Sequence, residues 1–279
     1  MLSRIKRKGQ RIFLNDSQGT LKLLNGVQDI SFSYQSVTSS YSFLGSRKTF
    51  YAPSSPQIAS INVNSLLFYE DFFYNKIFTE DGFSGKIESG DKGFSFQDAH
   101  LVSYSSSCAV GEIPSISMQA DIYGEVKSEP EIEATKESLN SAFRVAGFNS
   151  LRLKLGDIFD TNRVLSYSLS ASVKRKPVYE FNKKSPENVI LDNPVEFSAR
   201  FRIEVDQYEI ENIRDIEKAN FGLKELTLVI CENSTSDIIQ SFGFKNVIID
   251  SENYSYSVDS NVFLDLSVRG YRSFDYEIN

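Results

Sequence analysis

Residues 94–104 read FSFQDAHLVSY and residues 242–252 read FGFKNVIIDSE, so one arrangement of apolar side chains recurs after 148 positions (242 − 94). Apolar residues two positions apart lie on one face of a β-strand. The two stretches therefore predict one strand that occurs twice, which is the signature of an internal repeat. The matched positions are Phe94 with Phe242, Phe96 with Phe244, Asp98 with Asn246, Ala99 with Val247, Leu101 with Ile249 and Ser103 with Ser251.

The strand that follows each of these stretches also alternates between apolar and polar residues. If the second copy is two residues shorter here, residues 116–122 correspond to residues 262–268, and Gly124 corresponds to Gly270. This alignment predicts a Ser-rich connection and then a strand that ends in glycine, in both copies.

A second repeated block precedes these strands. Apolar residues alternate with serine at 30–34 (ISFSY) and at 165–171 (LSYSLSA). Small polar side chains on the other face are typical of a sheet face that meets solvent. In both copies a basic, proline-containing stretch follows, at 37–56 and at 172–194, and a further alternating strand comes next.

Four matching strands in one order predict a duplicated, mainly β chain. We expect two tandem similar domains, each a β-sandwich or partly closed barrel with a helix. The expected units are a basic N-terminal segment at 1–24, a first β domain at 25–127, a linking helix at 128–147 and a second β domain at 148–279.

The linking helix is predicted by its ends. Ser128 and Glu131 have the spacing of a capping box, Pro130 suits the first turn, and Gly147 suits the C-terminal stop. A second amphipathic helix is predicted at 209–220, where isoleucines recur every three residues. Its counterpart in the first copy is 70–78, although the aromatic residues there suit a strand equally well.

The composition indicates a folded protein that does not cross a membrane. Hydrophobic residues make up 41% and charged residues 24% of the 279 residues, and no apolar run approaches the roughly 20 residues that span a bilayer. The N-terminus is basic, but residues 10–18 are polar where a signal peptide needs an apolar stretch. We therefore expect neither a membrane partner nor secretion by that route.

The net charge of −7 argues against a protein that grips nucleic acid through phosphates, because that function needs clustered Lys and Arg. The charge is compatible with a wall past which DNA slides, since negative groups repel phosphate. It is equally compatible with plain solubility.

The residue types needed for catalysis are scarce. His100 is the single histidine, it lies in an alternating segment, and Ile248 replaces it in the second copy, so a sheet position is a better explanation than a general base. Acidic groups such as Asp29, Asp71 and Asp160 are expected to be solvated surface charges rather than glycosidase or calcium sites. We expect no enzyme activity and no cofactor.

Cys108 and Cys231 are the two cysteines, and both lie in or beside apolar strands. They are expected to be buried thiols that behave as small hydrophobes rather than a disulfide or metal ligands. With His100 they supply three candidate zinc ligands, one short of a structural site. The absence of tryptophan weakens a sugar-binding interpretation, because tryptophan is favoured for stacking on sugars.

The order of these features resembles the tail tube protein family of tailed bacteriophages and related contractile machines. A long arm between two early strands is typical of that family and often contains Leu-Gly; here SSYSFLGSRKTFYAPSS follows the ISFSY strand and contains Leu44 and Gly45. The family also has a phenylalanine-led strand, a Ser-rich connection and a strand that ends in glycine, as at 94–124 and 242–270. The second arm lacks Leu-Gly and carries KRKP at 174–177, so the two arms are expected to contact different partners.

The resemblance implies a structural virion protein of the tail, assembled in the host cytoplasm. Its copies would form stacked rings, trimeric if the domain is duplicated and hexameric otherwise, and would contact other tail and baseplate proteins. Genomic DNA would pass through the lumen without specific binding, and serine and acidic side chains are candidates for the wall. The arm residues expected to contact other subunits or rings are Phe43, Leu44, Gly45, Arg47, Lys48, Phe50, Tyr51, Lys174, Arg175, Lys176 and Tyr179.

Two alternatives remain open at this point. A baseplate or tail-tip hub can also carry two tube-like domains, but it caps the tube instead of polymerising. A receptor- or glycan-binding β-sandwich module belongs to a different class and would not form a ring.

Overall fold

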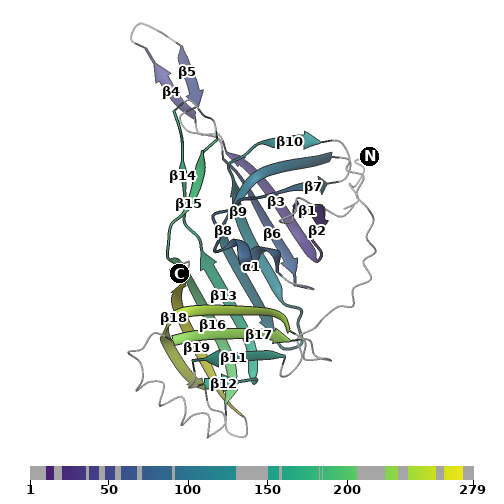
Figure 1. The fold of residues 1–279 in the computed structure, drawn as a ribbon, viewed down its shortest axis with the longest axis vertical. Helices are drawn as coiled ribbons and strands as arrows, with labels where there is room; N and C mark the ends of the chain where they lie inside the picture. The colour runs from purple at the N-terminus through teal and green to yellow at the C-terminus, as the bar shows by residue number, and fades with distance from the viewer. Residues whose placement is uncertain are drawn as a thin grey trace, which may run out of the picture.

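The computed structural model describes residues 11–15, 21–35, 38–43, 48–53, 58–67, 71–89, 92–129, 150–156, 159–181, 183, 185–205, 224–231, 238–255 and 261–272. This part of the chain is mainly β, as the alternating sequence predicts. It forms a 15-stranded antiparallel sheet and two separate two-stranded hairpins, with one short helix (Figure 1). Among these residues, no helix is long and apolar enough to cross a membrane.

The elements of the first half precede residue 130. They are β1 (Arg11–Asn15), β2 (Leu21–Leu23), β3 (Val27–Gln35), β4 (Thr38–Ser42), β5 (Thr49–Pro53), β6 (Ile58–Leu66), α1 (Phe72–Lys76), β7 (Phe83–Ser89), β8 (Lys92–Ala109), β9 (Ser115–Ile122) and β10 (Val126–Glu129).

The elements of the second half begin after residue 149. They are β11 (Leu151–Leu155), β12 (Phe159–Thr161), β13 (Val164–Ser172), β14 (Arg175–Val178), β15 (Asn188–Leu191), β16 (Val195–Val205), β17 (Lys224–Cys231), β18 (Ile238–Ser255) and β19 (Val262–Arg272).

The strands of the two halves pair in the same order. The first half runs β3-β6-β9-β8-β7-β1-β2, and the second half runs β13-β16-β19-β18-β17-β11-β12. The hairpin β4–β5 follows β3, and the hairpin β14–β15 follows β13. β10 adds a strand to β8 that has no described counterpart in the second half.

Two β-bulges fix which residues correspond between the halves. The register shifts between Leu101 and Ser103 in the first half and between Ile249 and Ser251 in the second, an offset of 148 (249 − 101). Leu101 lies opposite Ala120, and Ile249 lies opposite Val268, so the same offset continues into β9 and β19 (268 − 120).

The two-residue shortening assumed for this strand is therefore wrong. Ile122, not Gly124, corresponds to Gly270 (270 − 122 = 148). The error has a simple cause: a slip of two residues keeps every side chain on its own face of a strand, so alternation alone cannot detect it.

The corrected register explains an exchange of side-chain volume between the halves. Ala59 lies opposite Ile122 in the first half, and Phe197 lies opposite Gly270 at the corresponding place in the second. A Cβ atom on Gly270 would lie 2.6 Å from Cζ of Phe197. In both halves one small and one large residue thus fill the same space. The large residue is on β9 in the first half and on β16, the counterpart of β6, in the second.

The long strands β8 and β18 each bend at a residue with left-handed backbone. Asp98 has φ 55° and Asn246 has φ 57°, at the matched offset of 148 (246 − 98), and Asp and Asn tolerate this conformation better than most residues. Before the bend β8 pairs with β7, and after it with β9; β18 pairs in the same way with β17 and then β19. In Figure 1, β17 and β11 run across β13, β16 and β19.

One apolar core fills the space between the crossing strands. Along β16 the residues at odd numbers from Val195 to Val205 are buried and those between them are not, as period-2 alternation requires. The buried residues of both halves belong to a single contiguous cluster. Each fully buried Phe or Leu contributes about 1.5–3 kcal/mol.

The two halves are joined by strand pairing and by α1. Residues 103–109 of β8 pair with residues 166–172 of β13. The hydroxyl of Tyr74 in α1 donates to Gly243 O (3.3 Å) and accepts from Gly243 N (3.0 Å) in β18. The ring of Tyr74 packs edge-on against Phe242, with centroids 4.9 Å apart.

The helix predictions have mixed outcomes. The 70–78 prediction is confirmed for Phe72–Lys76, where Asp71 caps the helix by accepting from Phe73 N (2.8 Å). The linking helix does not begin at Ser128, because Ser128 and Glu129 pair with β8 as part of β10. Its remainder, 130–147, and the helix predicted at 209–220 lie outside the described residues.

Candidate assembly surfaces

A polar sheet face extends over both halves of the molecule. It belongs to β3, β6, β9, the end of β8, β13, β16, β19 and the end of β18, which are neighbours in the sheet. Serines and asparagines on adjacent strands hydrogen-bond across it: Ser33 to Ser60 (2.6 Å), Asn62 to Ser31 (3.2 Å), Ser107 to Ser115 (3.0 Å) and Ser170 to Ser198 (2.8 Å). The opposite face of the same strands is the buried apolar one.

The charges on this polar face are nearly balanced. By register it carries the carboxylates Asp29, Asp121, Glu196, Glu204 and Asp265 and the guanidinium groups Arg200, Arg202 and Arg269. Arg269 forms an ion pair with Asp250 (2.8 Å), and Arg202 lies over the Phe263 ring, 5.2 Å from its centroid. Burial raises the pKa of Asp121. The serine and acidic side chains of this face are accompanied by arginines in the second half.

Two strand edges lie at opposite ends of this face. In the described chain β3 has β6 as its strand neighbour on one side only. The last part of β18, from Ser251, pairs with β19 on one side only. The matching part of β8 has neighbours on both sides, β9 and β13. A sheet edge of this kind can accept a further strand.

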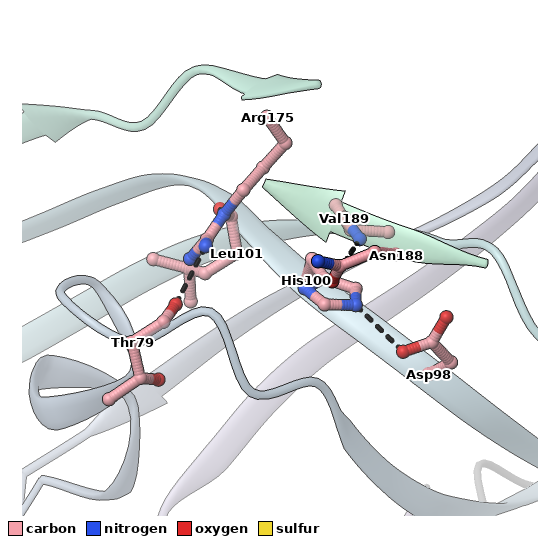
Figure 2. Close-up of polar contacts among 7 residues, drawn as sticks. All are labelled: Thr79, Asp98, His100, Leu101, Arg175, Asn188 and Val189. Carbon is pink, nitrogen blue, oxygen red and sulfur yellow. Dashed lines mark hydrogen bonds and ion pairs between the residues drawn. The ribbon is translucent and has the colours of Figure 1, made fainter. Parts of the chain in front are cut away.

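The second arm, β14–β15, lies against the first half of its own chain. Arg175 donates from Nη1 to Thr79 O (2.6 Å), from Nη2 to Lys76 O (3.2 Å) and from Nε to Leu101 O (3.1 Å) (Figure 2). Burial lowers the pKa of Arg175, yet the three carbonyl oxygens satisfy its buried donors.

The same contact involves Tyr123 of the first half. Burial, Asp121 and Tyr179 raise the pKa of Tyr123 to about 12, and the charge of Arg175 acts in the opposite direction. Tyr179 is itself half-buried, and burial raises its pKa. Figure 2 shows the strand that carries Asn188 and Val189 crossing the strand that carries His100.

The Arg175 guanidinium thus makes a contact inside its own chain, and Tyr179 is close enough to raise the pKa of Tyr123 in the same region. The contact of Arg175 and Tyr179 with another subunit stays a prediction. Lys174 and Lys176 are exposed, as a residue that contacts another subunit has to be before assembly.

The first arm, β4–β5, projects away from the sheet (Figure 1). Its apolar side chains are exposed: Tyr41 by 48%, Phe43 by 63%, Phe50 by 51% and Tyr51 by 74%. Phe43 and Phe50 contact edge to face, with centroids 5.7 Å apart, and Lys48 is also exposed. Leu44, Gly45 and Arg47 lie outside the described residues. Exposed aromatic side chains gathered on one arm mark an interaction site.

His100 occupies a buried sheet position, as its replacement by Ile248 indicated. The side chain is 3% exposed, its Nε2 lies 2.7 Å from Asp98 Oδ1, and its ring packs against Tyr123. Its Nδ1 is buried without a hydrogen-bond partner among the described residues. The imidazole is thus anchored beside the β-bulge of β8.

The cysteines are free thiols in the described chain. Cys108 is buried, and burial with nearby Glu112 raises its pKa to about 12, so the thiol stays protonated and unreactive near neutral pH. Cys231 is half-buried. The described residues contain no group of three His, Cys, Asp or Glu side chains that could hold a metal ion.

Asp71 is not the solvated surface charge that the sequence suggested. It is 3% exposed, and its carboxylate accepts from Phe73 N (2.8 Å) and from the Tyr104 hydroxyl (2.5 Å). Burial, and then the neighbouring Asp71, raise the pKa of Tyr104 well above its ordinary value. The backbone N–H of Asp71 also donates to Gln240 Oε1 of the second half (3.2 Å), so this residue contacts the second half through its main chain.

A cavity of about 750 Å³ lies beside α1 in the first half. It is lined by residues of β1, β2 and α1, among them Leu14, Lys22 and Phe72. The Asp71 carboxylate at its wall is already engaged by Tyr104 and Phe73, and Asn15 donates to Ser84 (2.5 Å). Apolar residues line the cavity together with the charged residues Lys22, Lys76 and Asp81.

No protein-family model matches the chain, and no curated protein matches its sequence. Its function is therefore inferred from the surfaces of the molecule.

The sequence singled out the arms but missed two exposed apolar side chains on the second half. Ile248 is 44% exposed and Tyr271 is 39% exposed, and they lie opposite Arg269 and Glu196 in the sheet. The exchange of His100 for Ile248 marked one of these positions, but the residue type alone does not tell an exposed isoleucine from a buried one.

Proposed function

We propose that this protein is a structural virion subunit that forms the stacked rings of a phage tail tube. The observation that carries the proposal is the junction between the two halves, which supplies a template for the junction between two copies. The resemblance of the arms and strand order to tail tube proteins supports the same assignment.

The two halves represent one tube-like unit that was duplicated. In each unit a sheet bends at Asp98 or Asn246, so that its two parts cover one another as in a sandwich or a partly closed barrel. The shared strand order, the matched bulges and the exchange of Phe197 and Gly270 for Ala59 and Ile122 support this interpretation.

The internal junction predicts the register of the external one. The bulges at Val27/Asp29 and Val164/Ser166 relate β3 to β13 by 137 positions (164 − 27), and β8 relates to β18 by 148. Inside the chain Ser170 lies opposite Ser105. The corresponding residues are Ser33 (170 − 137) and Asn253 (105 + 148), so Ser33 of one copy would lie opposite Asn253 of the next.

Repeating this junction closes a ring. Each contact joins different edges, β18 of one copy and β3 of the next, and such head-to-tail contacts generate rings when the rotation closes. Because each copy contributes two equivalent units, we propose a trimer with pseudo-sixfold symmetry. The second layer of strands covers the apolar face, so the polar face lines the lumen.

The polar face suits the passage of DNA. Its serines and asparagines already hydrogen-bond to each other across the strands. Its three arginines are offset by five carboxylates, so it offers no cluster of free cations for phosphates. We propose that DNA slides past this wall without specific binding, and that the ring has other tail or baseplate proteins as partners.

Cysteine pairing across the edge tests the ring. We would combine Ser33→Cys with Asn253→Cys in a Cys231→Ser background and oxidise the purified protein. Directly opposite side chains on neighbouring strands approach closely enough for a disulfide. The expected product is a covalently closed trimer on denaturing gels, and negative-stain images should show tubes.

The control pairs Ser33→Cys with Ser267→Cys, which lies on β19, one strand away from the edge, and should stay uncrosslinked. A protein that remains a single chain in both variants, and has a monomeric mass in solution, would overturn the ring and favour a receptor- or glycan-binding module. Isolated rings without tubes would assign the protein to a hub instead.

A further inference from the structure

We propose that the surface around Ile248 and Tyr271 is the docking site for the β4–β5 arm of the neighbouring copy in the same ring. This inference rests on the proposed ring and adds to it a second interface, one that the strand edges do not form. It comes from a comparison of the two arms, of which one is docked within the chain and the other is not.

The two arms are built in the same register. Arg175 lies opposite Leu191 in the second arm, and Thr38 lies opposite Pro53 in the first. These pairs correspond at an offset of 137 for the outgoing strand (175 − 38), which is the offset between β3 and β13. For the returning strand the offset is 138 (191 − 53). Val189 of the second arm therefore corresponds to Tyr51 of the first (189 − 138).

The second arm shows where such an arm docks. It lies at the bulge of β8, where Arg175 donates to Leu101 O. The charge of Arg175 also acts to lower the pKa of Tyr123, whose ring packs against His100. By the offset of 148, the corresponding surface on the second half consists of Ile249, Tyr271 and Ile248. The described residues place no arm there.

Burial separates the docked arm from the undocked one. His100 and Tyr123 are 3% and 7% exposed beneath the second arm, whereas their counterparts Ile248 and Tyr271 are 44% and 39% exposed. On the arms themselves Val189 is 2% exposed and its counterpart Tyr51 is 74% exposed. Both sides of the second contact are thus present and uncovered in a single chain.

The occupant follows from the strand path. Inside the chain β13 pairs with β8 and runs directly into the arm that docks on the first half. When β3 of the next copy pairs with β18 in the same way, its arm is delivered to the same place on the second half. Another copy of this chain is therefore the partner, and its aromatic side chains would meet Ile248 and Tyr271, which lie beside Arg269 and Glu196 in the sheet.

The two docking sites differ in their chemistry. Arg175 holds the second arm by three carbonyl oxygens, but its counterpart is Thr38, which has no cation to donate. The first arm must instead be held by apolar contact, through Tyr51 on Ile248 and Tyr271. The receiving residue differs as well: it is His100, whose Nε2 lies 2.7 Å from Asp98 Oδ1, in the first half and Ile248 in the second.

Site-specific photo-crosslinking tests the docking. A benzophenone amino acid at position 51 would be activated in the assembled full-length protein, and the linked peptides would be identified by mass spectrometry in a mixture of isotopically light and heavy chains. We expect light-to-heavy links from position 51 to residues 246–250 or 269–272. The same probe at Ile238, which is 64% exposed at the far end of β18, should give no link to the first arm.

A disruptive variant gives an independent measurement. Ile248→Asp should weaken ring formation at least tenfold in a sedimentation titration, whereas Ile238→Asp, at an even more exposed position outside the proposed site, should not. If the Ser33–Asn253 disulfide forms rings but position 51 links elsewhere or not at all, the docking proposal fails and the ring stands. If neither the disulfide nor the crosslink forms, both proposals fail.

Discussion

At the scale of the residue, the protein fills equivalent spaces with different side chains. Ala59 and Ile122 in the first half, and Phe197 and Gly270 in the second, have exchanged bulk across neighbouring strands. The Phe197 ring also stacks on Phe244, with centroids 3.8 Å apart. Core packing depends on total volume as well as on which residue supplies it.

This exchange predicts a strong coupling between Phe197 and Gly270. Gly270→Ile alone should destabilise the fold by roughly 1–3 kcal/mol or more through overpacking, and Phe197→Ala alone by roughly 3–5 kcal/mol through a cavity. The double variant recreates the Ala59–Ile122 pair, so its loss should be clearly smaller than the sum. Urea denaturation of the four proteins measures this, and simple additivity would refute the compensation.

At the scale of the element, α1 is short but connects the halves. The helix has five residues, too few to be stable by itself. Its position is fixed by the Asp71 cap, by the Tyr104 hydroxyl on the same carboxylate, and by Tyr74 against β18. Tertiary contacts rather than helix propensity therefore determine this element.

The hydroxyl of Tyr74 gives the element its own prediction. Tyr74→Phe keeps the ring against Phe242 but removes both hydrogen bonds to Gly243, so the free energy of unfolding should fall by about 1–3 kcal/mol. Tyr41→Phe removes the same hydroxyl from an exposed arm and should change stability by less than about 0.5 kcal/mol. Thermal or urea unfolding followed by circular dichroism compares the two, and equal effects would contradict the role of Tyr74.

At the scale of the whole molecule, one kind of junction is used inside the chain and proposed between chains. The internal junction comprises the β8–β13 pairing over residues 103–109 and 166–172, the α1–β18 contact and the docked arm. An interface of this extent should hold the halves together without the covalent connection between Glu129 and Ser150.

A cleavage experiment tests this expectation. A protease site placed in the connection between Glu129 and Ser150 should be cut in the folded protein, and the two fragments should then co-elute in gel filtration under native conditions and separate only in denaturant. The uncut protein with the same insertion is the control. Fragments that separate in native buffer would show that the linker, not the sheet, keeps the halves together.

Local sequence patterns were enough to predict the β character of the chain, the apolar residues of each strand and the order of the repeated strands. Alternation is a local property, so it can be read without knowing which strands are neighbours. The sheet position of His100 could be predicted for the same reason, because Ile248 replaces it in an otherwise matching strand.

Strand register, burial and the covering of surface residues depend on distant neighbours, and they became visible in the three-dimensional structure. It corrected the counterpart of Gly270 from Gly124 to Ile122, because a two-residue slip leaves alternation unchanged. It showed that Asp71, predicted to be a surface charge, is a buried helix cap. It also showed that Arg175 binds three carbonyl oxygens of its own chain and that Ile248 and Tyr271 are exposed. Register, burial and coverage arise from contacts between residues far apart in the chain, and no local pattern encodes them.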